Sequence, residues 1–473
     1  MRVYFTLGLF LLIGLPTQAQ IINIPDADFK AKLLAANTSN SIAVNGLLPI
    51  QIDSNANNEI EISEALQVTS LNVSIANIHD LTGIEYFTNL RSLNCNQNHI
   101  PSLVVNNLIN LKSLYCSLNL LSNLDLTGLT HLTTLECAEN ILTQINFSNA
   151  NSIQNISCRF NFLTALEVSA LYNLQTLNFD YNQLTTVDLS NLTQLLDLGC
   201  QSNQFTSLDL SALVNLRSLN CSFNQLTALD LSGLNAITTL NCANNLLNSL
   251  DVTNLSQLVL LNCEHNQINH PFVLDGMVDL ESVYCQHNLI PSLTFNDLSS
   301  LAVLDCSANQ LTTLDASGLP ALSLLNCHEN TLLADLNIKN GSNESFLDFS
   351  NNPNLLSVCA DGEQITTVQN LISQYGYTNC QLSSLCNLGI LSSSFPLSVK
   401  IYPNPVKNTL QVSLDDQQKI NLIAIYNALG QKVSSSTCFT TAANLDVSDL
   451  KNGTYFIQVT TDMGTATTPF IKK

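Results

Sequence analysis

Cysteine has the most reactive side chain in this 473-residue chain, and its spacing is regular. Val73, Phe179 and Phe349 take the same place in the series as the cysteines. A position that also accepts valine and phenylalanine is a packing position, so we predict buried thiols that act as small hydrophobic groups. One thiol per repeat offers no four-ligand zinc cluster, and the parallel Cβ atoms of stacked repeats oppose disulfide geometry. Eleven of the fifteen cysteines form this series at steps of 21 or 22 residues or twice that: Cys95, Cys116, Cys137, Cys158, Cys200, Cys221, Cys242, Cys263, Cys285, Cys306 and Cys327.

The histidines and carboxylates show no arrangement that is typical of catalysis. Seven histidines are scattered, and only His265 and His287 share one position of adjacent repeats. That pair is open to two interpretations, a metal pair or exposed polar residues. The chain contains no glycine-rich phosphate loop, no His-Glu-x-x-His and no nucleophile elbow. We therefore predict that the protein is not an enzyme and requires no cofactor.

One acidic segment, residues 53–64, has the spacing of a cation-binding loop. It resembles a calcium loop of the EF-hand type, with Ile60 at the eighth position and Asn58 where glycine is usual. The alternative is a polar turn ahead of a short helix that starts near Ser63. If calcium binds, the resemblance implies the ligands Asp53, Asn55, Asn57, Glu59, Glu61 and Glu64.

A repeated unit positions these residues. Each copy has the form L-x-x-L-x-C-x-x-N-x-L, as in residues 90–100. The alternation around positions 4 and 6 predicts a short strand with one buried face. The asparagine at position 9 falls in a turn, where its amide can satisfy buried backbone groups, so we predict an internal hydrogen-bond ladder. A fixed period of this length indicates a solenoid, in which each unit buries its apolar edge against its neighbours.

Over residues 68–355 the unit resembles the short 21-residue bacterial leucine-rich repeat, sometimes called IRREKO-type. The resemblance implies a mainly β, curved solenoid whose main sheet lines a concave ligand-binding face. Exposed aromatic side chains beside polar ones are typical of interfaces, so Arg159, Phe160, Tyr181 and Phe223 are the predicted contact patch. The alternative is that these aromatic residues only cover the edge of the turn. The other candidates for contact on this face are Tyr115, Glu264, His265, Gln286 and His287.

Both ends of a solenoid expose core residues and need caps. An amphipathic helix over residues 24–34 predicts a helical N-terminal cap within residues 20–66, with the solenoid at 67–358. A helix over about residues 363–374 predicts a C-terminal cap, followed by a linker, within residues 359–396. A disulfide between Cys359 and Cys380 would pin that helix over the open end.

Short alternating runs with regular turns in residues 397–473 predict a small Ig-like β-sandwich. Tyr402-Pro403-Asn404-Pro405, the turn at 425–430 and the terminal Phe470-Ile471-Lys472-Lys473 resemble the C-terminal sorting domain of the type IX secretion system of Bacteroidetes. The resemblance implies the secretion machinery as a partner and the outer cell surface as a location. The alternative is an ordinary Ig-like stalk.

The beginning of the chain and its charge agree with export. One arginine, an apolar run over residues 5–15 and Thr17-Gln18-Ala19 predict a signal peptide at 1–19. The run is shorter than the ~20 residues that span a bilayer, so we expect no membrane span in the mature protein. A net charge of -21 disfavours nucleic acid as a partner.

These features together predict a secreted, surface-displayed recognition or adhesion protein that binds an extracellular protein or glycan without chemistry. The alternative is an accessory carbohydrate-binding protein in nutrient capture.

Overall fold

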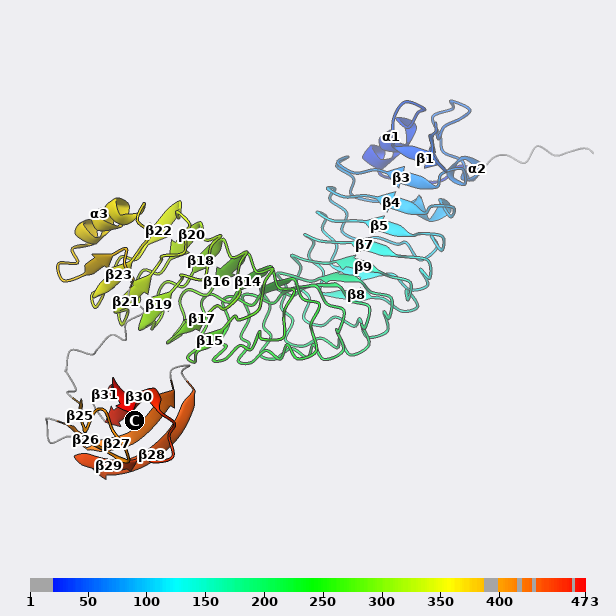
Figure 1. Ribbon diagram of the computed structural model, residues 1–473. Coiled ribbons are helices and arrows are strands. Elements are labelled where there is room, and N and C mark those ends of the chain that lie inside the picture. Colours follow the sequence, from blue (N-terminus) through cyan, green and yellow to red (C-terminus); the bar gives the residue numbers. More distant parts are fainter. Residues whose placement is uncertain (1–19, 387–398, 415–418, 428–430, 462–463) are drawn as a thin grey trace, which may run out of the picture. The chain divides into compact units, whose positions relative to one another are not determined.

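The computed structural model describes residues 20–386, 399–414, 419–427, 431–461 and 464–473 (Figure 1). The predicted signal peptide and most of the predicted linker lie outside these residues. The chain divides into two compact units, one up to Leu385 and one from Cys386 onward. Within the described ranges every helix is too short or too polar to cross a membrane.

A small cap precedes the first coil, and its helical character confirms the prediction. Helix α1 (Ala27–Leu34) begins at Asp26, whose side chain accepts a hydrogen bond from the Phe29 amide at 2.8 Å. Phe29 and Leu33 are fully buried on the inner face of this helix. Strand β1 (Ala43–Asn45) pairs antiparallel with β2 (Leu48–Pro49) and with the first strand of the solenoid, and α2 (Ile62–Ala65) leads into that strand. The cap thus closes the open edge of the sheet.

One long sheet runs through the solenoid. It holds sixteen strands, and beyond the cap every neighbouring pair is parallel, because each coil presents its strand in step with the previous one. The middle residue of each strand, such as Leu177, points into the core while its two neighbours stay at least partly exposed. The strands that follow the cap are β3 (Ser70–Asn72), β4 (Ser92–Asn94), β5 (Ser113–Tyr115), β7 (Thr134–Glu136), β9 (Asn155–Ser157), β10 (Thr176–Asn178), β11 (Asp197–Gly199), β12 (Ser218–Asn220), β13 (Thr239–Asn241), β14 (Leu260–Asn262), β16 (Ser282–Tyr284), β18 (Val303–Asp305), β20 (Leu324–Asn326) and β22 (Phe346–Asp348).

The second half of the coils carries shorter and less continuous strands. In Figure 1, β15, β17 and β19 lie along one side of the coils and β14, β16 and β18 along the other. Where no strand forms, an aspartate still shapes the turn: Asp209 Oδ1 accepts the Ser211 amide at 3.0 Å. Hydrogen bonds from the Ser211 backbone and hydroxyl hold the pKa of Asp209 below its usual value. The strands of this half are β6 (Asn123–Asp125), β8 (Gln144–Asn146), β15 (Phe272–Val273), β17 (Leu293–Thr294), β19 (Thr313–Asp315), β21 (Asp335–Asn337), β23 (Ser357–Cys359) and β24 (Gln381–Ser383). A 3-10 turn, η1, spans Ile84–Tyr86.

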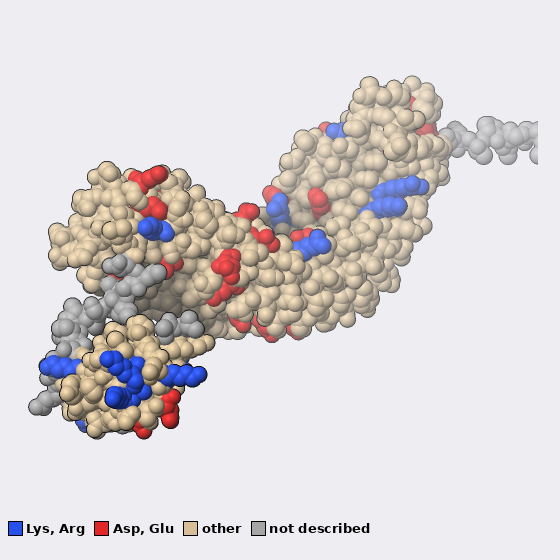
Figure 2. All heavy atoms as spheres, in the orientation of Figure 1, with Lys and Arg blue, Asp and Glu red and all other residues tan. Residues whose placement is uncertain are grey.

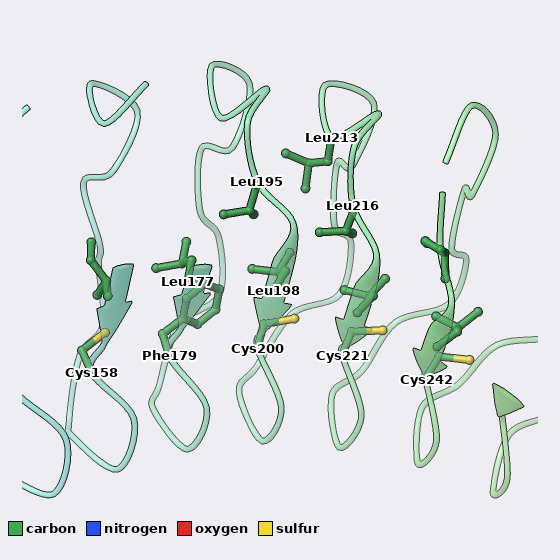
Figure 3. Close-up of a cluster of buried hydrophobic side chains, with 14 of the residues drawn as sticks. Cys158, Leu177, Phe179, Leu195, Leu198, Cys200, Leu213, Leu216, Cys221 and Cys242 are labelled. Carbon is green, nitrogen blue, oxygen red and sulfur yellow. The ribbon is translucent and has the colours of Figure 1, made fainter. Parts of the chain in front are cut away.

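The cysteine column lies inside the solenoid, as predicted. Figure 3 shows Cys158, Cys200, Cys221 and Cys242 in one row, with Phe179 filling the same place in its coil. All eleven of these cysteines are free and fully buried. Burial raises the pKa of the Cys158 and Cys221 thiols to about 12. These thiols therefore pack as hydrophobic groups and stay protonated.

The asparagine column forms the predicted ladder. Asn203 Nδ2 donates to the carbonyl oxygens of Phe179 in the previous coil and Cys200 in its own coil, at 3.1 and 3.2 Å. Its Oδ1 accepts the Leu184 amide of the previous coil at 3.0 Å. The same bonds recur from Asn98 to Asn330. Each asparagine therefore joins two coils and satisfies backbone groups that face the core.

The C-terminal cap contains the predicted helix, α3 (Ile365–Tyr375), which buries Val368 and Ile372. The predicted Cys359–Cys380 disulfide is wrong. Cys380 is a free thiol, whereas Cys359 and Cys386 are disulfide-bonded. The strand register explains this result, because β23 and β24 align Cys359 with Ser383. Cys380 precedes β24 and is three residues, or ~10 Å of extended chain, from Ser383, which is beyond the reach of a disulfide with Cys359.

The second unit is a small β domain, as predicted. Strands β25 (Val399–Tyr402), β26 (Thr409–Leu414) and β29 (Ala442–Asp446) form one antiparallel sheet. The other antiparallel sheet contains β28 (Lys432–Thr440), β27 (Ile420–Asn427), β30 (Gly453–Thr461) and β31 (Gly464–Lys472). Buried residues of both sheets, including Leu410, Ile457 and Phe470, share one core.

Candidate recognition surface on the turn edge

The turn after each strand of the long sheet places one residue in a left-handed conformation. This residue precedes the ladder asparagine in every coil from Gln97 to Asn351. At Phe160, Tyr181 and Phe223 the φ angle is 54°, 56° and 55°. A positive φ is uncommon for residues other than glycine. It lets the chain turn the asparagine inward while its neighbour points out. We call the outward residues on both sides of the asparagine the turn edge.

Large apolar side chains gather on the turn edge of the middle coils. Their exposed fractions lie between 39% and 52%, although the ladder asparagines of the same turns are mostly buried. The sequence predicted Phe160, Tyr181 and Phe223 as contact residues but missed the others. We call this set the apolar stripe: Leu118, Leu120, Ile141, Phe160, Phe162, Tyr181 and Phe223.

Phe160 and Tyr181 form the centre of the apolar stripe. Their rings stack with centroids 4.3 Å apart and planes only 9° apart. The Arg159 guanidinium lies 5.9 Å from the Phe160 centroid, a weak cation–π contact at this exposure. Gln201 Nε2 donates to the Tyr181 hydroxyl at 3.2 Å. The two rings therefore cover each other's inner faces, and three of the four predicted patch residues lie together.

The predicted residues further along form a second, polar group. The His265 and His287 rings stack with centroids 4.2 Å apart and planes 11° apart. Beside them, Gln286 Nε2 donates to the Glu264 carboxylate. Among the residues that the structure describes, no three His, Cys, Asp or Glu side chains are grouped to hold a metal ion. The two histidines are exposed and have the same left-handed backbone conformation as the aromatic pair.

Tyr115 stands apart from both groups, at the end of β5 on the strand face. In most coils this strand position is occupied by Asn or Asp, and its side chain shapes the following turn. Asn178 Oδ1 accepts the Asp180 amide at 3.0 Å, and Asn220 Oδ1 accepts the Ser222 amide at 3.2 Å. These side chains are engaged within the protein. The strand face therefore offers fewer free side chains for a ligand than the turn edge does.

Asp180 anchors the turn that carries Tyr181. Its carboxylate accepts the Gln201 amide at 2.6 Å and is only 9% exposed. Burial raises the Asp180 pKa above its usual value, although hydrogen bonds and the Arg159 charge oppose the shift. Gly199 provides the space, because a Cβ there would lie 2.9 Å from Asn178 Nδ2 and 3.1 Å from Asp180 Oδ1.

The acidic loop at residues 53–64 is closed by its own hydrogen bonds. Asp53 accepts the Asn57 and Asn58 amides, both at 3.0 Å, and Asn58 is left-handed with φ of 63°. Glu64 accepts the Ser54 and Glu61 amides at 2.7 and 3.1 Å. Asp53, Glu61 and Glu64 are all buried.

Side-chain hydrogen bonds from Glu64, and then from Asn57, lower the Glu61 pKa. The other predicted ligands lie at the rim, where Asn55 Nδ2 contacts Glu61 at 3.2 Å and Glu59 pairs with Lys30 at 2.6 Å. The oxygen-rich composition fits calcium. Calcium binding here stays a prediction, and titration of the wild type against Asp53→Ala tests it.

Comparison with known proteins agrees with this geometry. The chain is similar to the functional domain of InlJ from Listeria monocytogenes, which includes a cysteine ladder, with 25% identity and a TM-score of 0.55 over 96% of this chain and 99% of that one. It is also similar in fold to the internalin InlF from the same organism, with 20% identity and a TM-score of 0.53 over 79% and 99% of the two chains. No curated protein matches the chain. Residues 400–473 match the family described as a secretion system C-terminal sorting domain.

The chain is a leucine-rich repeat solenoid with a type IX secretion sorting domain. The sorting domain marks the leucine-rich repeat protein for secretion and attachment at the cell surface. Charge differs between the two parts: residues 20–385 hold 31 acidic and 7 basic residues, and residues 397–473 hold 5 and 7. Figure 2 shows basic side chains concentrated on the sorting domain and sparse on the solenoid. The leucine-rich repeat solenoid is therefore strongly acidic, which disfavours nucleic-acid phosphates as a partner.

Sequence reasoning missed four members of the apolar stripe for an identifiable reason. Leu120, Ile141 and Phe162 directly follow the ladder asparagine, and Leu118 directly precedes it. Read as part of an apolar run, Leu120 and Leu121 both resemble core residues. The signal that separates them is the alternation through the turn, in which the asparagine and the leucine two residues later point inward.

Proposed function

We propose that this leucine-rich repeat protein is a recognition protein of the cell surface, which binds an extracellular partner through the apolar stripe and performs no chemistry. The observation that carries the proposal is the stripe itself. Seven large apolar side chains of the turn edge stay 39–52% exposed, and six of them lie on the four successive coils from Leu118 to Tyr181. Monomeric soluble proteins rarely expose a contiguous apolar patch of more than a few hundred Å² without a function. A secreted protein that displays one gains stability when a partner covers it.

The arrangement of the rings supports a protein partner over a glycan. A sugar stacks on the flat face of an aromatic ring. Phe160 and Tyr181 turn their faces toward each other at 4.3 Å, and Arg159 lies over Phe160. The aliphatic members of the stripe, such as Ile141, offer nothing that a hydroxyl-rich ligand would prefer over water. Apolar side chains of a folded protein can instead pack against ring edges and aliphatic groups.

The experiment uses Phe160→Ala with Tyr181→Ala as the test variant and His265→Ala with His287→Ala as the matched control. Both double variants remove a stacked ring pair from the same turn position. Extracellular proteins captured from the natural surroundings of the organism are then measured against each by surface plasmon resonance. We expect the aromatic variant to weaken binding at least about 30-fold, since central aromatic contacts often contribute ~2 kcal/mol. Equal binding by the wild type and both variants would remove the stripe from the proposal.

The alternative, an accessory carbohydrate-binding protein in nutrient capture, rests on the exposed Phe223 and Tyr181 rings. Affinity electrophoresis in gels that contain plant or algal polysaccharides separates the two functions. Retardation of the wild type that Tyr181→Ala and Phe223→Ala abolish would favour the glycan. Unretarded migration in every gel, together with stripe-dependent protein binding, would favour the protein.

A further inference from the structure

The apolar stripe has a regular spacing that restricts the shape of a partner. Six of its seven members lie on the four successive coils from Leu118 to Tyr181. The strands of neighbouring coils pair in one sheet, so the coils follow each other at ~4.8 Å. Apolar side chains therefore recur at intervals of ~4.8 Å, over ~14 Å along the solenoid.

The backbone of the stripe has no free amide with which an extended segment could pair. The Phe160 amide donates to the Asp180 carbonyl oxygen at 2.9 Å. The Tyr181 amide donates to the Gln201 carbonyl oxygen at 2.8 Å. A strand laid over these residues would leave its own carbonyl groups unpaired against apolar side chains, which is costly. The other amides of the stripe on these four coils also donate to neighbouring coils: those of Leu118, Leu120, Ile141 and Phe162.

An α-helix satisfies its own backbone and has nearly the spacing of the coils. It rises ~5.4 Å per turn, so three turns span ~16 Å against the ~14 Å from Leu118 to Tyr181. This difference is smaller than one side chain. A strand places the residues of one face ~6.8 Å apart and misses the coil spacing by ~2 Å at each step. A helix with one apolar face, presented at i, i+4 and i+7, therefore fits the stripe better than a strand does.

A carboxylate interrupts the apolar stripe. Glu139 occupies the turn position between those of Leu118 and Phe160, is left-handed with φ of 54° and is exposed. The Arg159 guanidinium of the next coil lies near the Phe160 ring, and in the described part of the chain Glu139 forms no ion pair. A carboxylate that a partner covers is stable only beside a cation or a hydrogen-bond donor. The 31 acidic and 7 basic residues of residues 20–385 also favour a basic partner.

On the basis of the function proposed above, we propose that the partner presents an amphipathic α-helix along the apolar stripe, with a lysine or arginine paired to Glu139. The helix needs about three turns, or ~11 residues, to reach from Leu118 to Tyr181. Its apolar face covers Ile141, Phe162 and the ring edges of the aromatic stack. A second copy of this chain offers no such helix among its described residues, because α1 and α3 bury their own apolar faces in the caps.

A matched control for Glu139 exists near the end of the solenoid. Glu329 also precedes a ladder asparagine, is left-handed with φ of 58° and is exposed. It lies outside the apolar stripe, and its charged neighbour is His328 at 3.8 Å. If any carboxylate of the turn edge attracted a basic helix, Glu139→Gln and Glu329→Gln would have the same effect.

The test measures the binding of four synthetic peptides to the full chain by fluorescence anisotropy. The first peptide is a stapled helix with one leucine per turn on one face and lysines beside them. The second has glutamates in place of the lysines, the third has its leucines spread over all faces, and the fourth contains two prolines and no staple. We expect the first peptide to bind at least about tenfold more tightly than the third and fourth. It should bind about two- to fivefold more tightly than the second.

Variants of the chain then locate the site. Phe160→Ala with Tyr181→Ala should weaken binding of the first peptide at least about tenfold. Glu139→Gln should remove the advantage of the lysine peptide over the glutamate peptide, whereas Glu329→Gln should match the wild type. Should the double variant misfold, as judged by circular dichroism, Ile141→Ser decides by the same measurement, because it changes one exposed side chain of the stripe.

Two results would contradict the basic helix: equal binding of all four peptides, or an unchanged preference for lysine in Glu139→Gln. The chain could also capture an extracellular protein through the stripe, in the experiment described above, and bind none of the peptides. That result would overturn the helical partner and leave the proposed function intact. Absence of stripe-dependent binding to proteins and peptides alike would overturn both.

Discussion

The two stacked ring pairs on the turn edge share one backbone and differ in chemistry. Phe160–Tyr181 and His265–His287 have centroid distances of 4.3 and 4.2 Å and interplanar angles of 9° and 11°. All four residues are left-handed, with φ between 51° and 56°. The coil-to-coil spacing and the turn therefore set the stacking, whatever the ring is. The side-chain type alone decides whether that stretch of the edge is apolar or polar.

The residues that build the turn edge differ from the residues that it exposes to a partner. The ladder asparagines inside the turn are almost invariant from coil to coil, while the residues beside them change freely. A column that must satisfy backbone groups tolerates one residue type, whereas an outward position tolerates many. A solenoid of this kind can therefore carry different recognition surfaces on successive coils without a change in its fold.

The largest loss of stability should come from removing a ladder asparagine, because the asparagine column supports the turns that carry both pairs. Asn203→Ala removes the bonds to Phe179, Cys200 and Leu184 and leaves buried backbone groups unpaired. We expect a loss of about 2–4 kcal/mol in the free energy of unfolding. Urea denaturation followed by circular dichroism measures it. Gln204→Ala, at the exposed next position, is the control and should stay within about 0.5 kcal/mol of the wild type.

A smaller effect should come from disturbing only the aromatic pair. Gly199→Ala places a Cβ against Asn178 and Asp180, so the Asp180 carboxylate must move away from the Gln201 amide. We expect a destabilisation of about 1 kcal/mol, together with altered near-ultraviolet circular dichroism from Tyr181. The change in ellipticity is the decisive measurement. An unchanged spectrum would mean that the Tyr181 ring is positioned by the stack alone.

Much of this architecture could be predicted from the sequence, because the repeat makes each structural role visible many times. The buried cysteines, the asparagine ladder, both caps and the C-terminal β domain were predicted and are found. The aromatic contact residues were predicted on the concave strand face, whereas Phe160, Tyr181 and Phe223 lie in the turns that follow the strands. The residues one and two places after the asparagine look alike in composition, and only their direction distinguishes the exposed Phe162 from the buried Leu163.

Pair-specific features could not be predicted, because they depend on register between segments far apart in the chain. The alignment of Cys359 with Ser383 excludes Cys380 as its partner, and nothing in the spacing of the cysteines shows that alignment. The stacking of Phe160 on Tyr181 and the burial of Asp180 beside Gly199 likewise arise between coils. A single repeat, read by itself, contains no information about them.

A pH series can test the environment of the aromatic pair. Because burial raises the Asp180 pKa, the native state binds its proton more tightly than the unfolded chain does. The ionised Asp180 carboxylate therefore lowers the free energy of unfolding as the pH rises above its pKa. This loss is absent below the pKa of the unfolded chain, ~3.9, where the carboxyl group is protonated in both states. Asp180→Asn should be more stable than the wild type at pH 7, by less than about 1 kcal/mol, and equally stable near pH 3.5. Denaturant midpoints at the two pH values measure the difference.

The smallest change in stability should come from replacing the histidine pair with a second aromatic pair. His265→Phe with His287→Phe converts the polar stack into a second aromatic one on a backbone that already accommodates Phe160. We expect the free energy of unfolding to change by less than about 0.5 kcal/mol, since both positions are exposed and make few buried contacts. Binding of a hydrophobic fluorescent dye should nevertheless increase, because the apolar stripe gains a second segment. A large loss of stability would show that the histidines hold their turns through interactions that phenylalanine lacks, and the two pairs would then differ in structure as well as in chemistry.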